Sequence, residues 1–171
     1  MKTVFQIFMA TLMIMMGSTQ VDAQKFGYIN SQEIIGSMPE VKEANADIET
    51  LKQQLQKKGQ EMITAFQTKY RTLEDKQAKG EISPKQLEAE AAKLKDEEQK
   101  IMEYEETSQQ RIMQKGETLF KPIQDKVNQA IKDVAAENGY TYIFDASLGI
   151  ILYADESTDI TRLVKTKLGI R

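Results

Sequence analysis

The most constraining feature of this 171-residue chain is a long, highly charged stretch that carries a repeating apolar stripe. Residues 40–138 hold 17 Lys or Arg and 20 Asp or Glu side chains. Apolar residues recur among them in alternating steps of three and four, which is the heptad spacing of a coiled coil. The first series is Val41, Ala44, Ile48, Leu51 and Leu55. The pattern predicts long helices that each bury one stripe and expose the rest.

A single break divides this stretch into two helices. Gly80 predicts the end of the first helix, and Ser83 with Gln86 forms a capping box at the start of the second, with Pro84 in its first turn. Because so few residues separate the helices, they are predicted to lie antiparallel, as a hairpin arm over residues 39–138 with its tip near 80–84.

The outer ends of the arm carry signals of their own. A second capping box, Ser37 with Glu40, predicts the start of the outgoing helix, with Pro39 in its first turn. The pair Asn138 and Gly139 predicts the end of the returning helix. At 1.5 Å per residue the two helices are about 60 Å and about 80 Å long, so the longer one is expected to reach back over a separate body.

Strand-like segments flank the arm on both sides. Phe26 and Tyr28 alternate as they would in a half-buried strand. After the arm, residues 140–145 and 150–153 are β-branched and aromatic with a Gly-containing turn between them, which predicts a β-hairpin. A short amphipathic helix follows, with Asp159 as its expected N-cap and Gly169 as its stop. The chain is therefore predicted to be an α+β protein.

In this fold the helical hairpin is inserted in a small β body formed by residues 24–38 and 139–171. A body of about 48 residues normally needs disulfides or a metal to be stable, and the sequence has no Cys and no His. We therefore expect the body to oligomerise, with strands from several copies closing one sheet. Its aromatic and Ile residues are predicted to form the buried core of this oligomeric body, with a ligand cavity as the alternative: Phe26, Tyr28, Tyr142, Phe144, Ile151 and Tyr153.

Composition argues against several classes of function. Without His or Cys the chain lacks the commonest general base, the usual soft metal ligands and the thiol nucleophile. A net charge of −3 gives no electrostatic basis for nucleic-acid binding. The run from Asp155 to Asp159 resembles the start of a calcium loop, but Ile160 and Thr166 stand where Gly and Glu are required. We expect no catalytic residue, no metal and no cofactor.

The N-terminus has the three-part form of a secretory signal. A basic start at Lys2 precedes an apolar run from Val4 to Met16, and Val21 and Ala23 occupy the positions of a signal-peptidase site. Residues 1–23 are therefore predicted to be a cleaved signal peptide. An N-terminal membrane anchor is the alternative, although the apolar run is short for a span of about 30 Å.

Some arm residues are candidates for flexibility or for binding. Pro122 inside a helix forfeits one backbone hydrogen bond, and Gly116 and Gly59 lower helix propensity, so these three are candidate hinges. A static kink at Pro122 is the alternative. Several adaptable Met and apolar side chains lie partly off the seam and are candidates for contact with unfolded polypeptides, with ordinary seam packing as the alternative: Ile63, Phe66, Met102, Tyr104 and Met113.

The chain resembles the Skp/OmpH family of periplasmic chaperones in a series of short runs that follow the family's order. At the N-terminal side these are Phe26–Asn30 and Met38–Glu40, and at the C-terminal side Leu119–Ile123, Val127–Ala135, Gly139–Ala146, Ile151–Asp155 and Asp159–Thr161. The coiled-coil stretch adds little specificity, because any charged hairpin has a similar composition.

The resemblance implies a periplasmic homotrimer whose strands form a shared β body with three arms around a cavity. It implies an ATP-independent holdase that binds unfolded outer-membrane proteins, close to the membrane surface but without inserting the mature chain. The arm tip, residues 69–90, departs from the strongly basic members, with five basic and five acidic residues. No lipid-binding residues are carried over. An exported coiled-coil adaptor for a folded partner and an exported enzyme are the alternatives from other classes.

Overall fold

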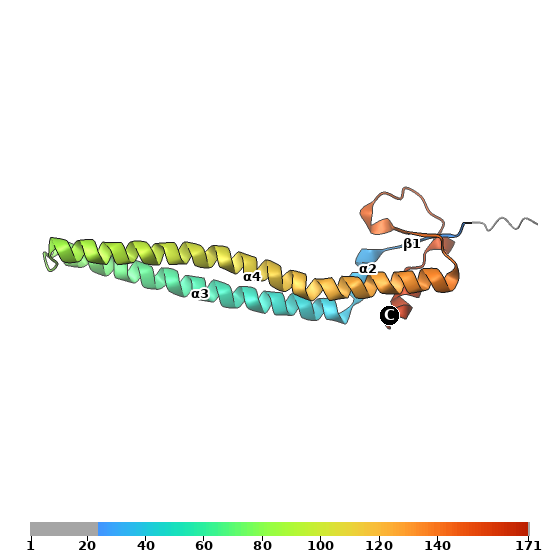
Figure 1. Ribbon diagram of the computed structural model, residues 1–171, viewed down its shortest axis with the longest axis horizontal. Coiled ribbons are helices and arrows are strands. Elements are labelled where there is room, and N and C mark those ends of the chain that lie inside the picture. The colour runs from blue at the N-terminus through green and yellow to red at the C-terminus, as the bar shows by residue number, and fades with distance from the viewer. Residues whose placement is uncertain (1–23, 171) are drawn as a thin grey trace, which may run out of the picture.

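Two long antiparallel helices dominate the computed structural model, which describes residues 24–170. Helix α3 (Pro39–Ala78) runs outward and helix α4 (Pro84–Asn138) returns beside it, with a small body at one end of the resulting arm (Figure 1). The predicted signal peptide, residues 1–23, lies outside the described residues. The predicted fold class, a helical hairpin on a small β body with a short C-terminal helix, is confirmed.

The turn at the arm tip forms through the predicted capping signals. The Ser83 hydroxyl accepts from the Gln86 amide N–H at 3.4 Å, and the Gln86 side-chain oxygen accepts from the Ser83 N–H at 3.1 Å. Gly80 adopts φ 70°, a left-handed conformation that favours glycine. Gly139 ends α4 in the same way, at φ 68°.

The capping box predicted at Ser37 and Glu40 is wrong. Ser37 is instead the last residue of a separate helix, α2 (Ser31–Ser37), and its hydroxyl donates to the Glu33 carbonyl at 2.7 Å. Helix α3 begins after Met38 without a side-chain cap, with Pro39 in its first turn as predicted. Helix α2 was not predicted, although Asn30 is a usable N-cap signal: its side-chain oxygen accepts from the Glu33 N–H at 3.1 Å.

The sheet consists of two parallel strands rather than a hairpin. Strand β1 (Phe26–Ile29) pairs with β2 (Tyr142–Asp145), with Phe26 opposite Tyr142 and Ile29 opposite Asp145. Within β1 the residues that face the interior are Gly27 and Ile29, so the predicted alternation has the opposite sense and the aromatic side chains face outward.

The strand predicted at residues 150–153 is absent from the described part of the chain. Asp145 accepts from the Ser147 N–H at 3.0 Å and starts a 3₁₀ turn, η1 (Ala146–Leu148), which Gly149 ends at φ 69°. This turn directs the chain away from the sheet. Residues 150–153 then find no strand within the same chain to share their backbone hydrogen bonds, so they do not form one.

The hydrophobic core lies where the body meets the base of the arm. Its fully buried members are Ile34, Met38, Ile160 and Val164, which come from α2, from the segments beside it and from helix α5 (Thr161–Lys167). The bases of α3 and α4 complete the core with Val41, Ala44, Ile123, Val127, Ala130 and Val134. The core is therefore shared between the body and the arm.

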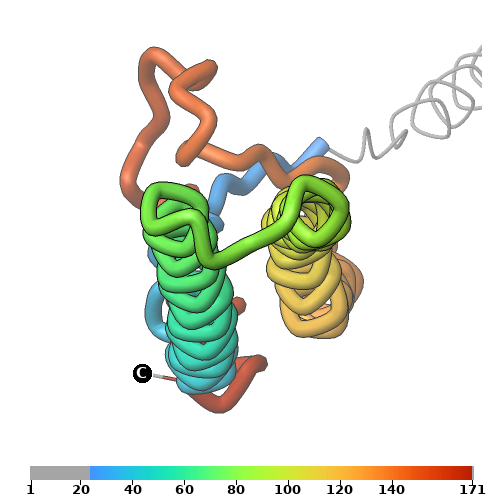
Figure 2. Tube along the Cα trace, turned by 90° about the vertical axis from the view of Figure 1, so that its left-hand side faces the viewer, coloured from blue at the N-terminus to red at the C-terminus, as the bar shows by residue number. Residues whose placement is uncertain are grey.

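Farther out, a single seam holds the arm together. Viewed from its tip, the arm is two helices side by side with no third layer (Figure 2). In the outer two-thirds of the arm Leu55, Leu94 and Ser108 are buried, and most of the other seam residues are half-buried. Exposed ion pairs such as Lys115 with Asp47, 3.2 Å apart, cross the seam, and pairs of this kind contribute about 0–1 kcal/mol each.

Candidate functional site

An exposed aromatic surface covers the outer side of the sheet. We call Phe26, Tyr142 and Phe144 the aromatic face. The Phe26 ring lies 5.7 Å from the Tyr142 ring and 6.3 Å from the Phe144 ring, centroid to centroid, in stacked geometry. All three side chains remain exposed. Strand pairing aligns them, because residues on one face of neighbouring strands lie opposite each other.

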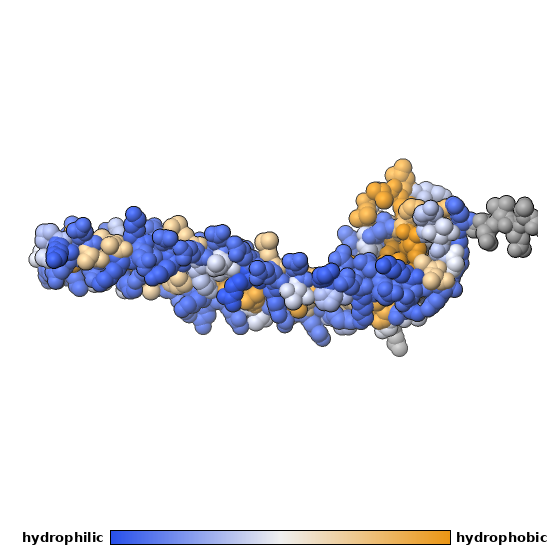
Figure 3. All heavy atoms as spheres, in the orientation of Figure 1, coloured by the Kyte–Doolittle hydropathy of each residue, from blue (hydrophilic) through white to orange (hydrophobic). Residues whose placement is uncertain are grey.

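An apolar loop adjoins this face. Residues 148–153 project from the body, and the space-filling view shows their hydrophobic side chains beside the sheet (Figure 3). Leu152 is 98% exposed, and Leu148, Ile150 and Tyr153 are also exposed. Leu148, Ile150 and Leu152 were not predicted as site residues, because the sequence placed Leu148 in a turn and the other two in a paired strand. Apolar surface of this kind on a soluble protein marks an interaction site.

Of the six residues predicted to line an oligomeric core, four lie on this surface: Phe26, Tyr142, Phe144 and Tyr153. Tyr28 and Ile151 are half-buried instead. The Tyr28 carbonyl accepts from the Ile160 N–H at 2.9 Å, which ties β1 to the segment before α5. Burial, with Asp159, Glu156 and Asp155 nearby, raises the pKa of Tyr28.

A cluster around Asp145 fixes the direction of the loop. The Asp145 carboxylate accepts from the Ser31 N–H at 3.2 Å, from the Ser31 hydroxyl at 2.5 Å and from the Ser147 N–H at 3.0 Å. Burial raises the pKa of Asp145, but these hydrogen bonds outweigh it and hold the pKa below its ordinary value of 3.8. The ionised carboxylate therefore connects the start of α2 to the start of the loop.

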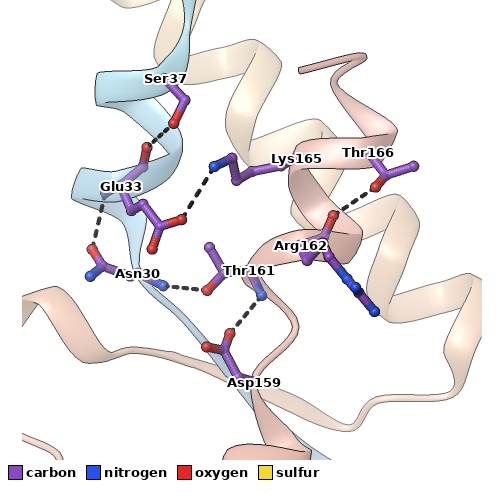
Figure 4. Close-up of polar contacts among 8 residues, drawn as sticks. All are labelled: Asn30, Glu33, Ser37, Asp159, Thr161, Arg162, Lys165 and Thr166. Carbon is purple, nitrogen blue, oxygen red and sulfur yellow. Dashed lines mark hydrogen bonds and ion pairs between the residues drawn. The ribbon is translucent and has the colours of Figure 1, made fainter. Parts of the chain in front are cut away.

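Helix α5 docks against α2 through a second polar cluster (Figure 4). The buried Thr161 hydroxyl accepts from the Asn30 N–H at 3.0 Å, and Lys165 lies 3.2 Å from the Glu33 carboxylate. Asp159, the expected N-cap, accepts from the Thr161 N–H at 2.8 Å, although the helix proper starts one residue later than predicted. This docking buries Val164 and holds the C-terminal segment to the body.

A groove opens between the two helices halfway along the arm. We call it the mid-arm groove; its volume of about 1010 Å³ is at the upper limit of the usual range for ligand pockets. Three of the five predicted polypeptide-contact residues line it together: Ile63, Met102 and Tyr104. Leu55, Ser108 and Ile112 also line it, and the sequence analysis missed them as site residues because their spacing indicates ordinary seam positions.

Tyr104 packs against Gly59 of the opposite helix, and both residues line the groove. The Tyr104 ring lies against Gly59, where an added Cβ would be 3.7 Å from the ring, and its hydroxyl donates to the Leu55 carbonyl at 3.3 Å. Gly59, a predicted hinge, is therefore also a packing position, because a bulky side chain from the opposite helix lies against it.

The remaining predicted residues lie elsewhere on the arm. Phe66 lines a separate groove near the tip, with its ring 6.3 Å from that of Tyr70, and Met113 is exposed outside both grooves. Of the hinge candidates, Gly116 approaches Ile48 and Pro122 lies inside an unbroken α4. Figure 1 shows the axis of α4 bending where its colour passes from yellow to orange, the region that contains Pro122.

Within residues 24–170 no group of three or more carboxylates is placed to hold a metal ion. None of the helices in that range is both long and apolar enough to cross a membrane. The described surface offers apolar and aromatic contacts on the body, and a groove flanked by charge on the arm.

Comparisons with known proteins agree with this architecture. The chaperone protein Skp of Yersinia enterocolitica is 28% identical over 146 residues, which cover 84% of this chain and 85% of that protein. The crystal structure of a candidate OmpH-like outer membrane chaperone from Caulobacter crescentus superposes with a TM-score of 0.74 at 20% identity, covering 89% of this chain and 88% of the other. A family model described as outer membrane protein (OmpH-like) matches residues 25–168, and the chain therefore belongs to the Skp/OmpH family.

Proposed function

We propose that this protein is a periplasmic chaperone of the holdase type, which binds unfolded outer-membrane proteins without ATP and prevents their aggregation. The observation that carries the proposal is the long, charged, two-helix arm on a small body in a member of the Skp/OmpH family. A holdase needs accessible surface and solubility rather than a catalytic centre. The arm offers both, because one buried seam leaves most of its length in contact with water.

We further propose that the active form is a homotrimer assembled through the body. The aromatic face and the apolar loop 148–153 support this, because a chain that left them in water would itself be prone to aggregation. The outer edge of β2 and the unpaired segment 150–153 also supply backbone groups for pairing with another copy. Three arms would then surround one client and hold it by many weak contacts.

The test is to dilute a denatured outer-membrane β-barrel protein out of denaturant with and without this protein, and to follow light scattering in the absence of ATP. We expect scattering to be suppressed at about one trimer per client. Unchanged scattering would show that the protein is not a holdase. Selective binding to one folded protein, with no effect on scattering, would instead identify an adaptor.

A further inference from the structure

We infer that the mid-arm groove is a client-binding subsite that takes a bulky apolar side chain of an extended segment, next to a Lys or Arg of that segment. This inference rests on the proposed function and names the client chemistry that one part of the arm selects. Three predicted contact residues, Ile63, Met102 and Tyr104, line the groove together. Charged residues line it as well.

The floor of the groove is apolar and adaptable. Leu55 and Ile112 come from the seam, and Met102 lines the groove with 58% of its surface exposed. Methionine is unbranched and polarizable, so it can adjust to side chains of different shapes. A floor of this kind suits a client that presents Leu, Phe or Tyr without a fixed geometry.

The rim carries an excess of negative charge. Glu49, Glu105 and Glu106 line it with Lys52 as the one cation, and Lys52 lies 4.0 Å from Glu49. Glu105 and Glu106 form no ion pair within residues 24–170. Charge complementarity therefore favours a basic residue beside the apolar anchor.

Ser108 is an independent sign that the groove is incomplete without an occupant. It is only 8% exposed, it lines the groove, and its hydroxyl has no hydrogen-bond partner within residues 24–170. Buried polar atoms in folded proteins almost always have a partner. An extended client segment has unpaired backbone N–H and C=O groups, and either can pair with this hydroxyl.

The test compares two methionines of the same helix in the full protein. A short dye-labelled peptide that carries a Phe-Leu pair flanked by Arg is the probe, and fluorescence anisotropy reports its binding. Met102→Gln is expected to weaken binding about five-fold, because it removes an apolar contact in the groove. Met113→Gln, at an exposed position outside the groove, is expected to change binding less than about two-fold. A twin peptide with Glu in place of Arg is expected to bind more weakly than the Arg peptide.

Ser108→Ala separates a binding role from a structural one. Removing an unpaired buried hydroxyl is expected to raise the midpoint of thermal unfolding, and it is also expected to weaken the Arg peptide about two- to five-fold, because the client loses a hydrogen-bond partner. A purely structural residue would not move stability and affinity in opposite directions. A variant that is stabilised and binds as well as wild type would contradict a role for Ser108.

The outcomes also distinguish the subsite from the function. Equal effects of Met102→Gln and Met113→Gln, in a protein that keeps the denatured barrel soluble, would overturn the subsite and leave the proposed function standing. Equal binding of the Arg and Glu peptides would overturn the charge preference. A wild-type protein that neither keeps the barrel soluble nor binds the Arg peptide would overturn both proposals.

Discussion

The arm and the body solve the problem of exposed surface in opposite ways. The arm buries one narrow seam and covers the rest of its surface with charge, so it can stand alone in water. The body buries a dense core around Ile34 and Val164 and yet leaves the aromatic face and the loop 148–153 uncovered. The difference supports the proposal that other copies of the chain cover the body, whereas the arm buries its seam within one chain.

The extent of the core bears on whether the chain forms oligomers. On size alone, a body of about 48 residues is expected to be too small to be stable. The structure extends its core into the bases of α3 and α4, through residues such as Val41 and Val127, so the body is not limited to its own residues. The stronger argument for a partner is now the exposed apolar surface.

The largest expected effect is on the oligomeric state, which we expect to depend on the body and not on the arm. Tyr142 and Tyr70 are similarly exposed, at 53% and 48%, but Tyr142 lies on the aromatic face and Tyr70 on the arm. Tyr142→Glu is expected to convert trimers into single chains, since it places a charge in the proposed interface. Tyr70→Glu is expected to leave the mass of the trimer unchanged. Light scattering coupled to size-exclusion chromatography measures the mass of both variants. A wild-type protein with the mass of a single chain would refute the proposed trimer.

The next effect compares the two kinds of packing. Ile34→Ala, at a fully buried position in the body, is expected to lower the free energy of unfolding by about 3–4 kcal/mol. Ile101→Ala, at a half-buried position of the arm, is expected to lower it by about 1 kcal/mol. Chemical denaturation at one fixed protein concentration gives both values. Equal losses would mean that the arm is packed as tightly as the body.

A smaller effect concerns the Asp145 cluster and pH. Because the folded pKa of Asp145 is lowered, its stabilising contribution is present above the ordinary value of 3.8 and is lost as the pH falls through the lower folded pKa. Asp145→Asn is expected to lower the free energy of unfolding at neutral pH by about 1–2 kcal/mol. It is also expected to make that free energy less dependent on pH in the acid range. Unfolding followed by near-ultraviolet circular dichroism at a series of pH values would measure both changes. The same change at Asp155, whose carboxylate accepts only from the exposed turn it begins, is the matched control and is expected to have the smaller effect.

The smallest expected effect is on the stability of the arm when either of two glycines is replaced by alanine. Gly59→Ala is expected to stabilise α3 by about 0.5–1 kcal/mol, because the added Cβ fits beside Tyr104 and alanine favours helix. Gly80→Ala is expected to destabilise the tip by about 1 kcal/mol, because its φ of 70° strains a side chain. Hydrogen exchange along α3 reports both changes. If Gly59 is a hinge, the alanine variant is also expected to suppress client aggregation less well than wild type. Unchanged suppression would mean that Gly59 has only a packing role.

Much of this protein was determined locally and could be predicted. The hairpin, its tip at Gly80 and Ser83, and the end of α4 at Gly139 depend on capping and on the 3.6-residue period, which nearby residues set by themselves. The aromatic residues of the body were identified for the same reason, since β-branched and aromatic runs favour strands.

Tertiary structure decided what these local signals could not. Whether β2 pairs with β1 or with residues 150–153 depends on where the ends of the arm bring distant segments together, and the Asp145 cluster diverts the chain before a hairpin can form. The mid-arm groove likewise brings together Tyr104 and Gly59 across the seam, 45 residues apart in the chain. Sequence fixes local conformation through short-range sterics and hydrogen bonds, whereas strand partners and grooves arise from contacts between segments far apart in the chain.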